Sequence, residues 1–176
     1  EQFVFSKTVV RYAKNVDKQG FIYRKSEEWD VFWKEILVPE LDFYHHVLPV
    51  HNLEEIFYLS SKFRDNIHLY TVYSGNEMVG GTVLFIDKNV VHCQYISVKS
   101  KFREKKVLDF LFYKLIKEDF KDYDYFDFGI SNEENGRKTN MGLLYWKEGF
   151  GARGVSQDFY KISTQNFSLI EKMFLK

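Results

Sequence analysis

The first part of the chain is predicted to be mainly helical from the spacing of its apolar side chains. Polar residues with interspersed valines over residues 7–19 favour a short helix, which Gly20 ends. After a short strand at 21–23, Ser26 can cap a second helix, whose apolar residues recur at i, i+3, i+4, i+7 and i+8. Pro39 is expected to end this second helix.

The middle of the chain changes from helical to strand patterning. Residues 41–51 are irregular, and the capping-box pair Asn52 and Glu55 then predicts a helix to about residue 64. Apolar runs separated by short polar turns follow, which is typical of an antiparallel meander. The three predicted strands are residues 67–73, 78–86 and 90–98.

The last part alternates between helices and strands. The predicted elements are a long helix, a strand, a helix and a final strand, at residues 103–120, 125–129, 140–148 and 155–162. A long helix between two strands favours a right-handed crossover with parallel pairing. The fold class is therefore α/β (α+β), with a mixed, mostly antiparallel sheet flanked by helices. Ligands are expected at the carboxyl ends of the parallel strands, residues 98–100 and 129–131.

Composition narrows the class of protein. The 176 residues are 45% hydrophobic, with only two prolines, which excludes a disordered or low-complexity chain. Lys+Arg and Asp+Glu are equal at 25 each, which argues against a dedicated nucleic-acid binder. The single cysteine, Cys93, allows neither an internal disulfide nor a cysteine-based zinc site, so a cytoplasmic location is predicted. No apolar run is long enough to span a membrane.

Two segments resemble a known family. They are YFDFGIS at residues 125–131 and NMGLLYWKEGFGA at residues 140–152, with a weaker contribution from PVHNLEE at 49–55. Together with the order of elements, they resemble the GNAT superfamily of N-acetyltransferases. Within it, the match is to the branch with the Fem-type aminoacyltransferases of peptidoglycan synthesis and their single-acyl relatives. The resemblance covers residues 21–162.

This resemblance also implies a domain organisation. Members of the branch often carry two such domains in tandem, joined by a helix that bears Lys and Arg. Residues 1–20 would then be a linker helix after an amino-terminal half, residues 21–163 the GNAT-like domain, and residues 164–176 a carboxyl-terminal helix. The start of the chain, which lacks a methionine and a signal-peptide pattern, agrees with the expectation that it is the carboxyl-terminal half of a longer protein.

The turn after the third meander strand gathers positive charge. Five Lys or Arg and one Glu occupy residues 99–106. Cations are unfavourable at a helix start unless an anion binds there, because its free N–H groups already make it positive. The resemblance implies that this turn holds the pyrophosphate of acetyl-CoA or another acyl-CoA. The predicted donor-binding residues are Ser97, Val98, Lys99, Lys101, Phe102, Arg103 and Lys105. The usual glycine-rich pattern is absent, and a solvated basic turn is the alternative.

Three residues are candidates for the chemistry. Asp127 is an acid in an apolar strand, and is either a base or substrate-orienting acid, or a carboxylate that holds the loop at 130–139. Lys147 rises from the apolar side of its helix, and either reaches solvent or stabilises an oxyanion in a cleft. The resemblance supports the oxyanion role, because Fem-type enzymes have a functional lysine in the matching element. Tyr145 corresponds loosely to the acid that many acetyltransferases direct at the leaving thiolate, with aromatic packing as the alternative.

Polar residues near the expected site are candidates for binding the acceptor. They are His46, His51, Gln94, Tyr95, Ser131 and Asn140. His51 could also act as a base near neutral pH, although loop histidines often only pack on aromatic rings. His92 and Gln94 are expected on one face of their strand. The histidine spacing matches no metal site, so no metal is predicted, and Cys93 is predicted to lie in the core.

The predicted function is acyl transfer from acyl-CoA to a small-molecule amine by direct attack. The acceptor suggested by the resemblance is a cell-envelope sugar or peptide precursor. One alternative is a Fem-type transfer from aminoacyl-tRNA, which the zero net charge makes less favourable for this domain alone. Another is a non-catalytic half that packs against an amino-terminal GNAT-like half and presents the substrate.

Overall fold

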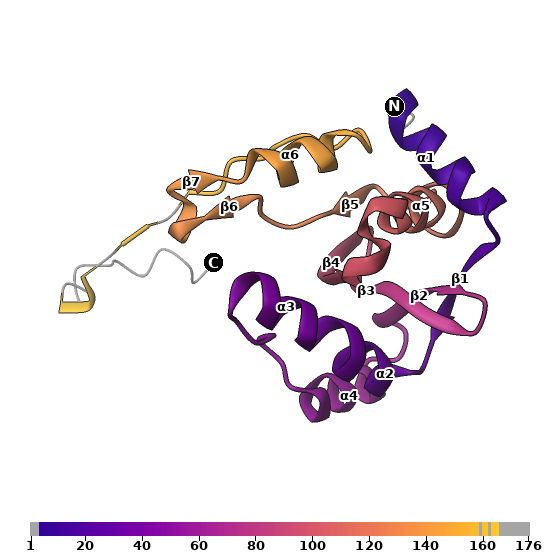
Figure 1. Cartoon of the computed structure of the whole chain (residues 1–176). Helices are drawn as coiled ribbons and strands as arrows, with labels where there is room; N and C mark the ends of the chain where they lie inside the picture. Colours follow the sequence, from indigo (N-terminus) through magenta and orange to yellow (C-terminus); the bar gives the residue numbers. More distant parts are fainter. Residues whose placement is uncertain (1–3, 159, 162, 166–176) are drawn as a thin grey trace.

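In the computed structural model, which describes residues 4–158, 160–161 and 163–165, two layers of helices enclose a five-stranded sheet (Figure 1). The sheet has the order β1-β2-β3-β4-β5. Its strands are β1 (Phe21–Ser26), β2 (Ile67–Ser74), β3 (Glu77–Asp87), β4 (Val90–Val98) and β5 (Tyr125–Asp127). The first four strands pair antiparallel, and β5 lies parallel to β4. The predicted mixed, mostly antiparallel sheet is confirmed.

One face of the sheet is covered by α1 (Lys7–Lys18) and α5 (Val107–Lys114), which pack on each other. The buried side of α1 supplies Val9, Ala13 and Val16 to the same core as α5, and Phe150 joins them after α6 (Met141–Glu148). The predicted linker helix at residues 1–20 therefore shares a hydrophobic core with the sheet.

The other face is covered by a helical segment that crosses the position of Pro39. It runs through α2 (Trp29–Phe32), the π-helical turn η1 (Trp33–Leu37) and α3 (Val38–His45), and α4 (Leu53–Lys62) packs beside it. The expected end at Pro39 was wrong. Pro39 stands in the first turn of α3, where its missing N–H costs no hydrogen bond, and the wide π turn comes directly before it.

The crossover from β4 to β5 is a helix in three parts, where the sequence predicted one helix over 103–120. A 3₁₀ turn, η2 (Ser100–Lys105), comes first, α5 follows, and the π-helical turn η3 (Leu115–Asp119) ends the crossover. Lys106 has a left-handed φ of 60° between η2 and α5, which interrupts regular helical hydrogen bonding. The positively charged residues therefore lie in a separate tight turn before the helix.

A β-bulge interrupts the pairing of β3 with β4. Val83 lies opposite Tyr95 and Leu84 opposite Cys93, so Gln94 has no partner in the ladder. Cys93 belongs to the core under α5, whereas Tyr95 belongs to the core under α2 and η1. Cys93 and Tyr95, although two residues apart, therefore lie on opposite faces of the sheet, because the inserted residue shifts the alternation. The expectation that His92 and Gln94 share a face stays a prediction.

After β5 the chain forms a small hairpin and then α6. The hairpin consists of β6 (Asn132–Glu133), the turn η4 (Glu134–Gly136) and β7 (Lys138–Thr139). The predicted last strand at 155–162 was wrong for the described residues 155–158, 160 and 161, none of which is in a strand; Val155 and Tyr160 are both more than 80% exposed there. Residues 159 and 162, and nearly all of the predicted helix at 164–176, lie outside the described residues.

Candidate active site where β4 and β5 diverge

The candidate site begins where the pairing of β4 with β5 stops. Residues 90–92 lie opposite residues 125–127, and Gly129 then takes a left-handed φ of 69°. Among the described residues, no strand pairs with the β5 side of β4 beyond His92. Backbone N–H and C=O groups on that edge can therefore bind a ligand. The bulge at Gln94 lies within this edge, and bulges are common beside active sites.

His92 and Asp127 form a pair across the last rung of the β4–β5 ladder. Nδ1 of His92 lies 2.7 Å from Oδ2 of Asp127, and Oδ1 of Asp127 accepts a 2.7 Å hydrogen bond from the Gly129 amide. The carboxylate thus holds the imidazole by Nδ1, which leaves Nε2 available to a substrate. The same carboxylate holds the amide of Gly129 directly after β5, just before the loop at 130–139. A role of Asp127 as base or substrate-orienting acid stays a prediction.

The environment of Asp127 favours its charged form. Burial by itself would raise the pKa of Asp127, but the hydrogen bond from the Gly129 amide and the contact with His92 outweigh burial, and the pKa lies below its ordinary value. Asp127 therefore stays a carboxylate at neutral pH. An ionised carboxylate on Nδ1 fixes the orientation of the imidazole.

Lys147 lies buried beside this pair, with 5% of its surface exposed. Its Nζ donates to the backbone oxygens of Gly129 at 3.0 Å and Ile130 at 2.7 Å. Burial lowers the pKa of Lys147, and the nearby charge of Asp127 opposes that lowering. The lysine therefore does not reach out to solvent. An ammonium group has three N–H donors, so one is left for an oxyanion.

Cys93 lies near both charged groups but is not suited to nucleophilic chemistry. It is buried in the core, and burial raises its pKa well above the ordinary value. A thiol that resists ionisation is a poor nucleophile. Cys93 is a core residue, as predicted.

Two predicted acceptor-binding residues are joined on the other face of β4. Oη of Tyr95 accepts a 3.0 Å hydrogen bond from the His51 amide and lies 2.7 Å from Nδ1 of the same histidine. Tyr95 packs edge-on against Trp33 at a centroid distance of 5.1 Å. The loop that carries His51 is thus attached to β4 next to the bulge.

The other predicted site residues of this region are dispersed. Asn140 caps α6: its Oδ1 accepts from the Leu143 amide, and its Nδ2 donates to Glu133. Ser131 accepts the Asn140 amide through its backbone oxygen. His46 ends α3 in a left-handed conformation and is exposed. Tyr145 is 80% exposed, on a different side of α6 from the buried Lys147.

The turn predicted to bind the donor is rich in cations, but the chain's own carboxylates pair with several of them. Nζ of Lys99 lies 3.0 Å from Glu77, and Nζ of Lys101 lies 2.9 Å from the same carboxylate. The Lys101 and Lys99 hydrogen bonds hold the pKa of Glu77 below its ordinary value. The first two cations of the turn therefore share one internal counter-ion.

A second carboxylate, Glu40 of α3, occupies the centre of the turn. It accepts from the backbone N–H of Ser100 at 2.7 Å and from the Ser100 hydroxyl at 2.8 Å and 2.9 Å. Arg103 lies 3.5 Å from the same group and stacks on Tyr44, with Cζ 3.7 Å from the ring centre. Free backbone N–H, hydroxyl and guanidinium groups are the donors that bind phosphate oxygens. The carboxylate of Glu40 thus occupies the position that a phosphate group of a ligand would take.

The remaining predicted donor-binding residues divide between core and surface. Ser97, Val98 and Phe102 are buried. Nζ of Lys105 lies 5.9 Å from the centre of the Phe21 ring and 5.8 Å from that of Phe102.

Sequence reasoning missed His92, Glu40 and Glu77 as site residues. His92 faces Asp127 only because of the parallel register of β4 with β5, and the two residues are 35 positions apart in sequence. Glu40 follows the expected helix end at Pro39, whereas the continuation of α3 past Pro39 carries it to Ser100. The excess of cations over residues 99–106 was the one signal that internal carboxylates were needed.

Within the described ranges, no group of three or more His, Cys, Asp or Glu side chains is placed to hold a metal ion. None of the helices in the described part of the chain is both long enough and apolar enough to cross a membrane.

A family model described as an acetyltransferase (GNAT) domain matches residues 19–147. The chain belongs to the GNAT acetyltransferase family. It is therefore a transferase domain, in agreement with the predicted enzyme class. The residues that the family model matches include the whole five-stranded sheet, the basic turn and Lys147. No curated protein matches the chain.

Solved structures share the fold of this GNAT domain at low sequence identity. FemX is 11% identical with a TM-score of 0.66, over 84% of this chain and 54% of FemX. L-PGS from Bacillus licheniformis is 14% identical with a TM-score of 0.62, over 85% of this chain and 53% of L-PGS. The chain thus spans about half the length of either protein. AAC(6')-Iy, in complex with the bisubstrate analogue CoA-S-monomethyl-acetylneamine, is 15% identical with a TM-score of 0.56, over 81% of this chain and 97% of its own.

Proposed function

We propose that this GNAT domain transfers an acyl group from an activated carrier to an amine, with His92 as the base and Lys147 as the oxyanion donor. The observation that carries the proposal is the arrangement of three groups at the diverging ends of β4 and β5. The His92 imidazole is held by Asp127 at Nδ1, and the Lys147 ammonium is held beside it by the carbonyls of Gly129 and Ile130.

The reaction follows from these groups. The amine nitrogen attacks the acyl carbonyl, and Nε2 of His92 takes the proton that the nitrogen loses. The carbonyl oxygen becomes an oxyanion, which the third N–H of Lys147 and the free N–H groups of the β4 edge stabilise. When the intermediate collapses, the bond to the carrier breaks, and the leaving thiolate takes the proton from His92. No bond to the enzyme forms, in keeping with the inert Cys93.

The donor we propose is acyl-CoA, as expected for the GNAT family and supported by the CoA analogue bound to AAC(6')-Iy. The donor groups of Ser100 and Arg103 suit a pyrophosphate, which would displace the carboxylate of Glu40. The acceptor would be a small-molecule amine, and a cell-envelope sugar or peptide precursor is the class that the Fem-type resemblance suggests.

Transfer from aminoacyl-tRNA is the second candidate. The observation that favours it is that carboxylates of the chain itself pair with the cations of the basic turn. Glu40 and Glu77 form ion pairs with cations that would be needed to bind the pyrophosphate of CoA. The likeness in fold to FemX agrees with it. The chain's coverage of only about half of FemX also keeps a substrate-presenting half, packed against an amino-terminal GNAT-like half, as an outcome of the test.

The test combines calorimetric titration of acetyl-CoA with an assay of thiol release in the presence of amino sugars and amino-acid amides. We expect acetyl-CoA to bind and His92→Gln to lower kcat by about 10²-fold or more, with little change in binding. Lys147→Met should lower kcat by about 10²–10³-fold. His68→Gln and Lys62→Met are matched controls outside the site and should keep the activity.

Two results would replace the leading proposal. Transfer from aminoacyl-tRNA without any response to acetyl-CoA would favour the second candidate. If neither donor binds or supports transfer, the result would favour a substrate-presenting half. Equal losses in His92→Gln and His68→Gln would remove His92 from the mechanism.

A further inference from the structure

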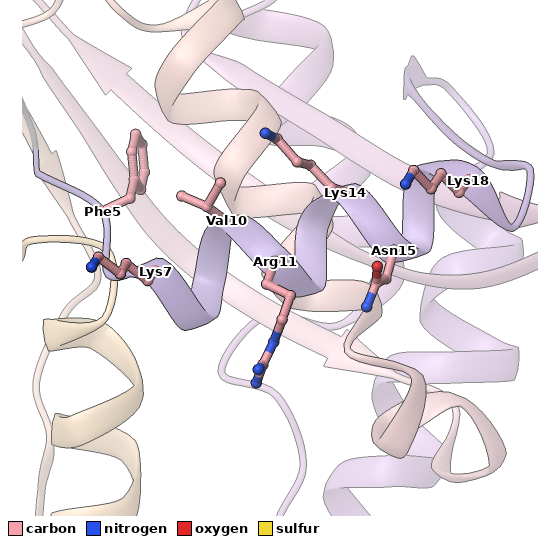
Figure 2. Close-up of a pocket in the computed structure, with 7 residues that line it drawn as sticks. All are labelled: Phe5, Lys7, Val10, Arg11, Lys14, Asn15 and Lys18. Atoms are coloured by element: carbon pink, nitrogen blue, oxygen red, sulfur yellow. The ribbon is translucent and has the colours of Figure 1, made fainter.

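The solvent side of α1 carries a continuous band of positive charge. Lys7, Arg11, Lys14 and Lys18, here called the basic face of α1, lie within an arc of about 60° and extend along roughly 16 Å of the helix. They line an open hollow of about 400 Å³ together with Phe5, Val10 and Asn15. In Figure 2, Arg11 and Asn15 point to one flank of the helix, and Lys14 and Lys18 to the other.

These cations lack the counter-ions found in the basic turn. Within the described part of the chain, none of the four has a carboxylate within 4.0 Å. The only carboxylate in the sequence of α1 belongs to Asp17, which lies 3.9 Å from Lys114 of α5. Like charges three and four residues apart repel one another on a helix, and Lys7 also meets the positive end of the helix dipole. A bound anion would reduce both the repulsion among the cations and the unfavourable interaction of Lys7 with the helix dipole.

The positive surface continues from α1 onto the end of the basic turn. Cζ of Arg11 lies 5.2 Å, and Nζ of Lys106 5.6 Å, from the centre of the Tyr12 ring. Lys105, the residue before Lys106, lies over Phe21, which follows α1. The last two cations of the turn therefore extend the charge of α1.

We propose that the basic face of α1 binds the phosphate backbone of a nucleic acid. A small-molecule site is typically an enclosed cavity, whereas this hollow is open to solvent and carries four cations along its length. A helix that lies in a membrane surface needs a free apolar side. Here Val9, Ala13 and Val16 of that side are at most 4% exposed in the core. A linear polyanion is the remaining partner that matches four cations in a row.

The overall charge of zero does not oppose this assignment, because the charges are segregated. Lys and Arg contribute four of the twelve residues of α1 against one Asp. Binding to phosphates depends on the local field and on the counter-ions released, which are set by the cations at the surface of contact.

The test is fluorescence anisotropy of a short, labelled, single-stranded RNA titrated with the protein at several salt concentrations. Four phosphate contacts predict a slope of log K against log salt of roughly −3. Arg11→Gln/Lys14→Gln should reduce the steepness by roughly 1.4 and weaken binding roughly tenfold at physiological salt. Lys34→Gln/Lys62→Gln removes the same charge from the opposite helical layer and should change the affinity by no more than about twofold.

The outcomes separate this inference from competing readings. Equal losses in the two double variants would overturn it, as would binding to vesicles of phosphatidylglycerol and phosphatidylcholine without binding to RNA. All four substituted residues are exposed, and circular dichroism will report whether each variant is folded. The inference does not rest on the proposed acyl transfer, because the assay contains no acyl donor. Failure of either proposal therefore leaves the other testable.

Discussion

The two cationic regions of this protein differ in how their charge is balanced. In the turn after β4, Lys99 and Lys101 pair with Glu77, and Arg103 and Ser100 contact Glu40. On α1, four cations face solvent without a carboxylate within ion-pairing distance in the described ranges. A ligand at the turn must displace an internal partner, whereas a ligand on α1 meets charges that are already available. A count of Lys and Arg therefore does not by itself locate an anion site.

The largest effect we expect in this comparison comes from removing the internal anion of the turn. Glu40→Gln keeps the shape of the side chain but removes the charge beside Ser100 and Arg103. The affinity for CoA should rise about fivefold to tenfold, because one unit charge at about 4 Å is worth about 1 kcal/mol even in water. Calorimetry measures this, with the exposed Glu54→Gln as the control. An unchanged affinity would mean that CoA does not use this turn.

A smaller effect is expected on the stability of α1. Lys7→Glu places an acid in the first turn of the helix and relieves repulsion with Arg11. The free energy of unfolding should rise by about 0.7 kcal/mol. The same change in the turn, Lys101→Glu, should lower it, because the new acid meets Glu77. Urea denaturation measures the free energy of unfolding of the two variants. An increase in both would contradict the proposed difference in charge balance between α1 and the turn.

The smallest effect concerns acid titration of the turn. The pKa of Glu77 lies below its ordinary value of 4.5, because of hydrogen bonds from Lys101 and Lys99. A carboxyl group whose pKa is lowered in the folded state stabilises the fold at pH values above its ordinary pKa. This contribution to stability is lost as the pH falls through the lowered pKa. Glu77→Gln should remove about 0.5 kcal/mol of stability at neutral pH, since the pair is partly exposed. The difference from the wild type should shrink below pH 4.5. A constant difference across the acid range would show that the ion pair contributes nothing.

The elements that the sequence predicted well are those with local signals. Asn52 and Glu55 form the expected capping box at α4, and the meander strands follow their alternating and apolar patterns. The elements that it predicted badly depend on neighbours. Pro39 lies inside a helical segment because a π turn precedes it, and residues 155–158 are not a strand because no partner strand pairs with them among the described residues.

The candidate site shows the same division. Lys147 and Asp127 could be selected from sequence, because a charge within an apolar pattern demands a partner. Their partners could not be selected from sequence, because they come from distant parts of the chain. Lys147 contacts backbone carbonyls of the loop after β5, and Asp127 contacts an imidazole on β4. Tyr145 and Asn140 show the converse. Both stand near Lys147 in sequence, yet one is exposed and the other caps a helix.

The sequence by itself determined the capping box at Asn52, the meander, the mixed sheet and the basic character of both α1 and the turn, because short-range spacing and composition encode these features. Its other predicted cap, Ser26, is instead the last residue of β1, and α2 begins after Glu28 without a side-chain cap. Only the tertiary structure decided the bulge at Gln94, the His92–Asp127 pair and which cations are neutralised. These depend on strand register and on contacts such as Glu40 with Ser100, 60 residues apart. Each of those contacts forms only when packing brings the two segments together, and no local pattern encodes that distance.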